Sequence, residues 1–161
     1  MSVRTLTVTL LLVALIAGCA ELSGEGDIKS STYTSFQQAS EMGVFESGWL
    51  PRALPRSATN IVEVHNVDSS EIWARFRYSG NDILGLTKGC AADRKTQLPN
   101  AERTKRDAEW WPAELTEGSA KQSRNKWMIF SCPKMRHAES IFPANLAVDF
   151  ASNTAWYWIT K

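Results

Sequence analysis

Two runs of alternating apolar and polar residues between positions 60 and 78 constrain the fold of this chain more than any other feature. Alternation with a period of two places successive side chains on opposite faces of a β-strand. The runs 61–65 and 72–78 flank a polar turn, so they predict a β-hairpin. In the second run one face carries Ile72, Ala74, Phe76 and Tyr78, and the other face carries Trp73, Arg75 and Arg77. In the first run Val62 and Val64 oppose Ile61, Glu63 and His65.

Three further segments extend this pattern into a sheet. Residues 126–132 form an apolar run that ends at Pro133, and residues 145–150 and 155–160 surround a small polar turn. Helical spacing and capping residues predict short helices over 32–42, 82–88 and 100–109, with an extended proline-containing segment at 48–58. The fold class that follows is α+β, a mostly antiparallel sheet of about five strands with short helices on one face.

The N-terminal segment has the three parts of an export signal. A single positive charge at Arg4 precedes an apolar run from Leu10 to Ala17, and small residues lead to Cys19. The run is shorter than the roughly 20 residues that a membrane-spanning helix needs. Leu15-Ile16-Ala17-Gly18-Cys19 resembles a bacterial lipobox, in which cleavage falls before the cysteine and the cysteine is acylated. An ordinary cleaved signal peptide with a coincidental cysteine is the alternative.

This motif also predicts the domain organisation. Residues 1–18 form a lipoprotein signal peptide, and residues 19–31 hold the lipidated Cys19 and a flexible tether of small and polar residues. Residues 32–161 form a single globular α+β domain. The two residues after Cys19 are Ala20 and Glu21, with no aspartate to retain a lipoprotein in the inner membrane. We therefore expect attachment to the outer membrane through the N-terminal lipid, facing the periplasm.

The charge balance argues against nucleic acid as a partner. The chain has 18 basic and 17 acidic side chains, and removal of Arg4 with the signal leaves equal numbers of each. A protein without a net positive field has no general attraction for a phosphate backbone. We therefore expect a protein or a glycan of the cell envelope, and not a nucleic acid, to be the partner.

Cysteines and histidines carry little recognisable chemistry. Cys90 and Cys132 are more typical of a disulfide in an exported protein than of a metal pair or a catalytic thiol. His65 and His137 belong to no zinc-binding motif, and Ser131 lies in no Gly-x-Ser-x-Gly nucleophile motif. The sequence therefore predicts a Cys90–Cys132 disulfide, no catalytic residue, no metal site and no cofactor.

One face of the predicted hairpin combines an aromatic side chain with charges of both signs. Its five members are Glu63, His65, Trp73, Arg75 and Arg77. A surface charge pairing across the two strands is the simpler interpretation. The sharper hypothesis is a binding patch with Trp73 as its anchor, because tryptophan and arginine are enriched at binding hot spots. The seven tryptophans of the chain favour a binding protein, since a small core cannot easily bury them all.

The segment from Gly48 to Phe76 resembles a known family of small bacterial lipoproteins related to the YbbD head domain. The residues that carry the resemblance are Gly48-Trp49-Leu50-Pro51, Leu54-Pro55-Arg56-Ser57-Ala58, Ile61, Glu63, His65, Asp68, Trp73 and Phe76. The resemblance implies an envelope lipoprotein with an α+β domain. It implies no established activity, so no catalytic residue is carried over from it.

These observations lead to two expectations about function. The first is a lipid-anchored cell-envelope protein that acts as a non-catalytic binding or assembly module. The alternative is a small periplasmic hydrolase. A deep pocket holding His65 or His137 beside a carboxylate would favour the hydrolase, and a flat or grooved aromatic surface would favour binding.

Overall fold

The computed structural model describes residues 27–93, 95–119 and 126–160, which form one antiparallel sheet with short helices. The signal peptide, the lipidated Cys19 and most of the predicted tether lie outside these residues. The seven strands are β1 (Ile28–Ser35), β2 (Thr59–Asn66), β3 (Ile72–Arg77), β4 (Ala91–Ala92), β5 (Met128–His137), β6 (Ser140–Asp149) and β7 (Thr154–Ile159). The helices are α1 (Phe36–Glu41), α2 (Ile83–Thr87), α3 (Ala101–Asp107) and the 3₁₀ helix η1 (Ala113–Leu115).

The sheet confirms the predicted antiparallel architecture but is larger than predicted. Its strand order is β1-β2-β3-β7-β6-β5-β4, seven strands where about five were expected. The two missed strands are the edges. β1 occupies residues that the sequence assigned to the end of the tether and to the start of a helix, and β4 is only two residues long. The predicted helix over 32–42 is correspondingly shortened to α1, whose first turn is capped by the Ser35 side chain.

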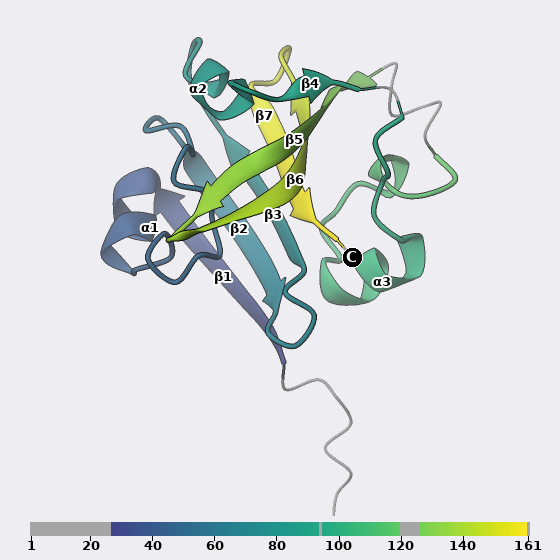
Figure 1. The fold of residues 1–161 in the computed structure, drawn as a ribbon, viewed down its shortest axis with the longest axis horizontal. Coiled ribbons are helices and arrows are strands. Elements are labelled where there is room, and N and C mark those ends of the chain that lie inside the picture. Colours follow the sequence, from purple (N-terminus) through teal and green to yellow (C-terminus); the bar gives the residue numbers. More distant parts are fainter. Residues whose placement is uncertain (1–26, 94, 120–125, 161) are drawn as a thin grey trace, which may run out of the picture.

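The sheet curls so that β5 and β6 pass in front of β2 and β3 (Figure 1). Its inner face encloses the larger hydrophobic core, to which β2, β3, β5, β6 and β7 all contribute. α1 and α2 add Phe36, Ala39, Ile83 and Leu86 to this core. The disulfide between Cys90 and Cys132, predicted from the sequence, joins the end of the α2 segment to β5 at one margin of it.

The outer face of the sheet carries a second core that is rich in tryptophan. Trp73, Trp156 and Trp158 project from β3 and β7, and they pack against Trp111 and Leu115 near η1. α3 and η1 therefore lie on the outer face, whereas α1 and α2 lie on the inner face. The prediction of helices on one face only is wrong, because the second set of tryptophans needed a cover of its own.

The segment between α1 and β2 closes the open side of the inner core. Leu50 and Leu54 are buried, and the Arg52 N–H donates to the Arg136 carbonyl of β5 at 3.1 Å. Gly48 adopts a φ of +83°, a conformation that favours glycine, and its Cα faces the Ala138 side chain of the β5–β6 turn. This turn of the backbone places Trp49 between β2 and the β5–β6 hairpin.

Candidate functional site

The structure separates the five residues of the predicted binding patch. The β2–β3 register pairs Glu63 with Ala74 and His65 with Ile72, so both side chains face the inner side of the sheet. Trp73, Arg75 and Arg77 lie on the outer side, where Trp73 is 0% exposed. The prediction of one shared patch anchored by Trp73 is therefore wrong. Period-two alternation had grouped the residues correctly within each strand, but it could not give the β2–β3 register, which places Glu63 and His65 on the face opposite Trp73.

On the inner side, Glu63 and His65 form a buried pair. The Glu63 Oε1 atom lies 2.7 Å from Nδ1 of His65, and both side chains are buried. The second carboxyl oxygen, Oε2, is buried and has no hydrogen-bond partner among the described residues. A buried carboxyl group with an unsatisfied oxygen is costly to ionise.

The pKa values of the pair follow from this burial. Desolvation raises the pKa of Glu63 to about 8. Burial, and secondarily the charge of Lys29, lowers the pKa of His65. At neutral pH the two groups are therefore uncharged, and the Glu63 O–H donates to Nδ1 of His65. The contact is a neutral hydrogen bond and not an ion pair, although its geometry suits either.

The Trp49 side chain covers the Glu63–His65 pair. Its indole ring stacks on the His65 imidazole with a centroid separation of 3.6 Å and an interplanar angle of 9°. A hollow of about 370 Å³ borders the three residues and reaches Ser31 and Tyr33 of β1. Trp49 is only partly buried: one face of its ring packs on His65, and the remainder of the ring is open to the hollow.

On the other side of Trp49 lies His137, which is also uncharged. Its Nδ1–H donates to the Gly48 carbonyl at 2.9 Å, and the Tyr157 hydroxyl donates to its Nε2. Burial lowers the pKa of His137, while the bond to Gly48 opposes that shift. Burial also raises the pKa of Tyr157. These bonds fix the imidazole in one tautomer and hold the turn that carries Trp49.

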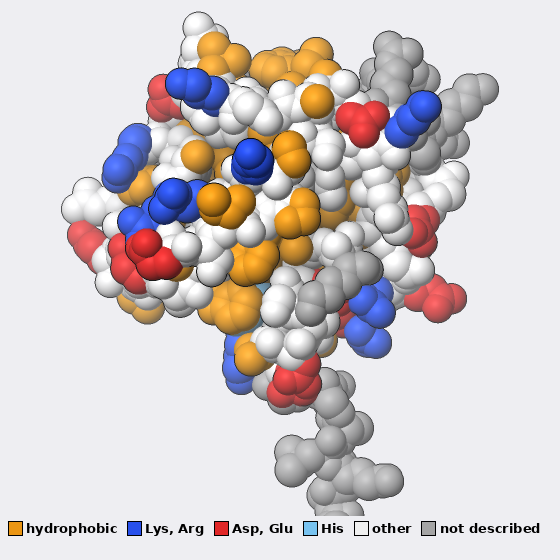
Figure 2. Space-filling model, viewed as in Figure 1, with side chains coloured by type: hydrophobic (Ala, Val, Ile, Leu, Met, Phe, Trp, Pro, Cys, Tyr) orange, Lys and Arg blue, Asp and Glu red, His pale blue; other side chains and the backbone are white. Residues whose placement is uncertain are grey.

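His137 and Trp49 line a mostly apolar hollow. This Trp49 hollow has a volume of about 340 Å³, and its lining includes Ile72, Ile159, Phe142 and Ser140. Phe142 and its neighbour Ile141 are exposed at 43% and 55%. Figure 2 shows hydrophobic side chains gathered on the face that β5 and β6 present to the viewer. A hollow of this size, apolar with a few fixed polar groups, is typical of a binding site.

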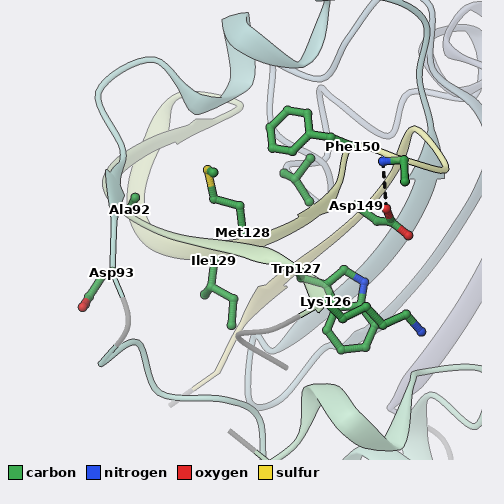
Figure 3. Close-up of a pocket in the computed structure, with 10 residues that line it drawn as sticks. Ala92, Asp93, Lys126, Trp127, Met128, Ile129, Asp149 and Phe150 are labelled. Carbon is green, nitrogen blue, oxygen red and sulfur yellow. Dashed lines mark hydrogen bonds between the residues drawn. The ribbon is translucent and has the colours of Figure 1, made fainter. Parts of the chain in front are cut away.

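A separate hollow of about 500 Å³ lies where β5 begins, beside the β6–β7 turn. Figure 3 shows Met128 on one side of β5 and Trp127 and Ile129 on the other, with Phe150 across from Met128. The Asp149 carboxylate accepts the Ala151 N–H at 2.9 Å, a bond that shapes the turn. This hollow contains neither histidine and no buried carboxyl pair, so it offers less chemistry than the region of Trp49.

The described residues hold no group of three or more histidine, cysteine, aspartate or glutamate side chains that could bind a metal ion. Within the same residues, no helix is long and apolar enough to cross a membrane. Neither histidine is hydrogen-bonded to a serine, threonine or cysteine side chain within this part of the chain. The site therefore offers a neutral acid–base pair, a fixed imidazole and an apolar hollow.

Most of the residues around Trp49 come from one segment of the chain, and that segment matches a known family. Residues 27–77 match the YbbD head domain. The match confirms the resemblance inferred from residues 48–76, and it covers less than half of the chain. No curated protein and no solved structure matches the chain. The YbbD head segment supplies Trp49, Glu63 and His65, whereas His137 and Phe142 come from outside it.

Sequence reasoning identified Glu63 and His65 as neighbours on one face, but it missed their partners. Trp49 was placed only within the predicted extended segment 48–58 and within the family resemblance. His137 carried no local motif, since its contacts to Gly48 and Tyr157 span 89 and 20 residues of sequence. One signal was available, because Gly48 lies three residues before Pro51, and glycine and proline are the residues that most often mark turns.

Proposed function

We propose that this chain is a lipid-anchored protein of the bacterial cell envelope that acts as a non-catalytic binding module. The observation that carries the proposal is the Trp49 hollow, an apolar space bordered by a partly exposed tryptophan and an exposed phenylalanine. Apolar anchors that enter such hollows supply most of the affinity at protein interfaces. The expected occupant is an apolar side chain of another envelope protein.

The position of the hollow supports this proposal. The β2–β3 turn that supplies Ser70 and Ile72 lies beside the entry of the chain into the sheet, where the Val67 N–H donates to the Asp27 carbonyl at 2.8 Å. Residue 27 is eight positions from Cys19 in the sequence. If Cys19 carries lipid and the predicted tether behaves as a flexible coil, its reach is about 15 Å. The Trp49 hollow would then open close to the membrane surface, where membrane-associated proteins are the available partners.

A photo-crosslinking experiment in intact cells tests this function. A photo-reactive amino acid would replace Phe142 at the rim of the hollow or, as the matched control, Phe150, which has a similar exposed fraction of 49%. We expect discrete crosslinked products from position 142 that are absent from position 150. Identical patterns from the two positions, or products from position 150 alone, would contradict binding at the hollow.

A small periplasmic hydrolase is the second candidate, and one observation favours it. In many hydrolases a carboxylate accepts the Nδ1–H of a histidine and so orients it as a catalytic base, and Glu63 is placed to do this for His65 once it loses its proton. The test is the turnover of simple ester substrates by the purified chain and by His65→Gln. Turnover that depends on His65 would support the hydrolase over the binding module.

A further inference from the structure

β1 is an open edge of the sheet. In the described part of the chain it pairs with β2 along one side only, and it is the first strand in the spatial order. It is eight residues long and contains no proline. The opposite edge, β4, is two residues long, a usual way of blunting an edge. The two edges of this sheet therefore differ, and only β1 offers a template long enough for a further strand.

Two hydrogen bonds show which backbone groups of β1 face outward. The Asp27 carbonyl accepts the Val67 N–H, so the main chain at residue 27 is directed toward β2. The Thr34 N–H instead donates to the Gln38 side chain at 2.6 Å, so it is directed away from β2. Because these directions alternate along an antiparallel strand, Ser30 and Thr32 share the outward direction of Thr34. Their N–H and C=O groups are available to a new partner.

Hollows flank this edge on both faces of the sheet. Thr32 and Tyr33 line the inner hollow of about 370 Å³ and also an outer hollow of about 580 Å³. The inner hollow is bounded by Met42 and Trp49, both of which expose apolar surface. Side chains of an added strand alternate between the two faces, so each hollow would receive every second side chain.

The lining of the outer hollow carries two arginines and no carboxylate. Arg75 and Arg77 line it, and neither forms an ion pair within the described residues. The guanidinium group of Arg75 lies over the Trp110 ring at 5.4 Å. Its lining contains no carboxylate, and the nearby Asp149 accepts backbone N–H groups of its own turn. The remaining lining is formed by hydroxyl, amide, aromatic and aliphatic groups, so a negatively charged occupant fits it best.

We propose that β1 binds an extended segment of a partner protein as an eighth strand of the sheet. The segment would carry acidic side chains toward Arg75 and Arg77, and apolar side chains toward Met42 and Trp49. Main-chain hydrogen bonds to Ser30 and Thr32 would supply affinity, and the two hollows would supply specificity. This surface shares Trp49 with the Trp49 hollow of the proposed function, but it also uses the main chain of β1 and the arginines of the outer face, which do not line that hollow.

Binding of two synthetic peptides to the full-length chain tests the inference. One labelled peptide alternates valine and glutamate, and the other alternates valine and lysine. We expect the glutamate peptide to bind at least tenfold more tightly in fluorescence anisotropy, and to slow hydrogen exchange at the Ser30 and Thr32 amides. Absence of binding, or equal binding of the two peptides, would overturn the proposal.

Two variants separate pairing at the edge from general attraction between charges. Thr32→Pro removes an outward N–H without removing a hydrogen bond to β2, and Thr32→Val keeps that N–H. We expect binding to be lost in the first and kept in the second. Arg77→Glu changes only an exposed side chain, so it tests the same surface should the proline variant fail to fold. It should abolish the preference for the glutamate peptide, because the new carboxylate then offsets the charge of Arg75.

Three outcomes of these variants would overturn the proposal. They are unchanged binding by Thr32→Pro, unchanged preference in Arg77→Glu, and dimerisation of the chain that Thr32→Pro abolishes. The last would identify a second copy as the occupant of the edge. Neither Thr32 nor Arg77 lines the Trp49 hollow, so these readouts and the Phe142 crosslinks of the proposed function can fail separately.

Discussion

At the scale of single residues, the most informative feature is the uncharged Glu63–His65 pair beneath Trp49. The sequence analysis predicted these two side chains on one face, but as charged groups at the surface. Their burial depends on the curl of the sheet and on the 48–58 segment, which crosses to β5 through the Arg52–Arg136 backbone bond. No local pattern encodes such a cover, and so burial reverses the electrostatic role that the residue types alone suggest.

The raised pKa of Glu63 predicts a stability that falls as pH rises. In the unfolded chain Glu63 loses its proton near its ordinary pKa of 4.5, whereas the folded chain keeps it until about pH 8. Below pH 6.5 the lowered pKa of His65 opposes this effect, because the unfolded chain then gains a proton on that residue. Between pH 6.5 and 8 only Glu63, of these two residues, changes the stability with pH. The free energy of unfolding therefore falls by about 2 kcal/mol over that interval.

Glu63→Gln should remove this pH dependence, because the amide donates to His65 without titrating. Chemical denaturation at pH 6.5 and pH 8 measures the effect. We expect the variant to gain about 2 kcal/mol relative to the original chain between these two values. Parallel losses in both proteins would show that Glu63 is already ionised at pH 6.5.

At the scale of elements, the strands with clear alternation were predictable and the edges were not. β2, β3 and β7 carry apolar side chains at period two, and each was assigned within two residues. β5 continues through Pro133 to His137, and β6 begins at Ser140, five residues before the predicted start, so both were predicted too short. β1 is rich in serine and threonine, and Tyr33 is its one buried residue. Main-chain pairing with β2, and not a hydrophobic pattern, therefore determines where this strand forms. The helices on both faces could not be predicted, since helical spacing does not show which face of a sheet a helix covers.

The Cys90–Cys132 disulfide is the one long-range constraint that the sequence did predict. The two cysteines are 42 residues apart, and closing a loop of that length stabilises the fold by about 4 kcal/mol in the chain-entropy model. Cys90→Ser/Cys132→Ser should therefore lower the free energy of unfolding by up to that amount. Mass spectrometry of the unreduced chain checks the bond itself. Two thiols that react with an alkylating reagent would contradict it.

At the scale of the whole molecule, we propose a membrane anchor that is joined to a domain with a binding surface. The anchor remains a prediction from the lipobox, and its residues lie outside the described part of the chain. Cys19→Ala should abolish incorporation of a labelled fatty acid and move the chain out of the membrane fraction, because acyl chains contribute roughly 0.8 kcal/mol per buried methylene. Labelling that persists in this variant would contradict lipidation at Cys19.

If the Trp49 hollow binds an apolar group of an envelope partner, a charge at its rim should prevent that binding. Phe142→Glu and Phe150→Glu each place a charge at an exposed phenylalanine, but only the first lies at the hollow. The measurement is the yield of the partner complex after chemical crosslinking in intact cells, with the thermal midpoint of each purified variant as the folding control. The account predicts a yield at least tenfold lower for Phe142→Glu and an unchanged yield for Phe150→Glu. Equal yields from the two folded variants would contradict it.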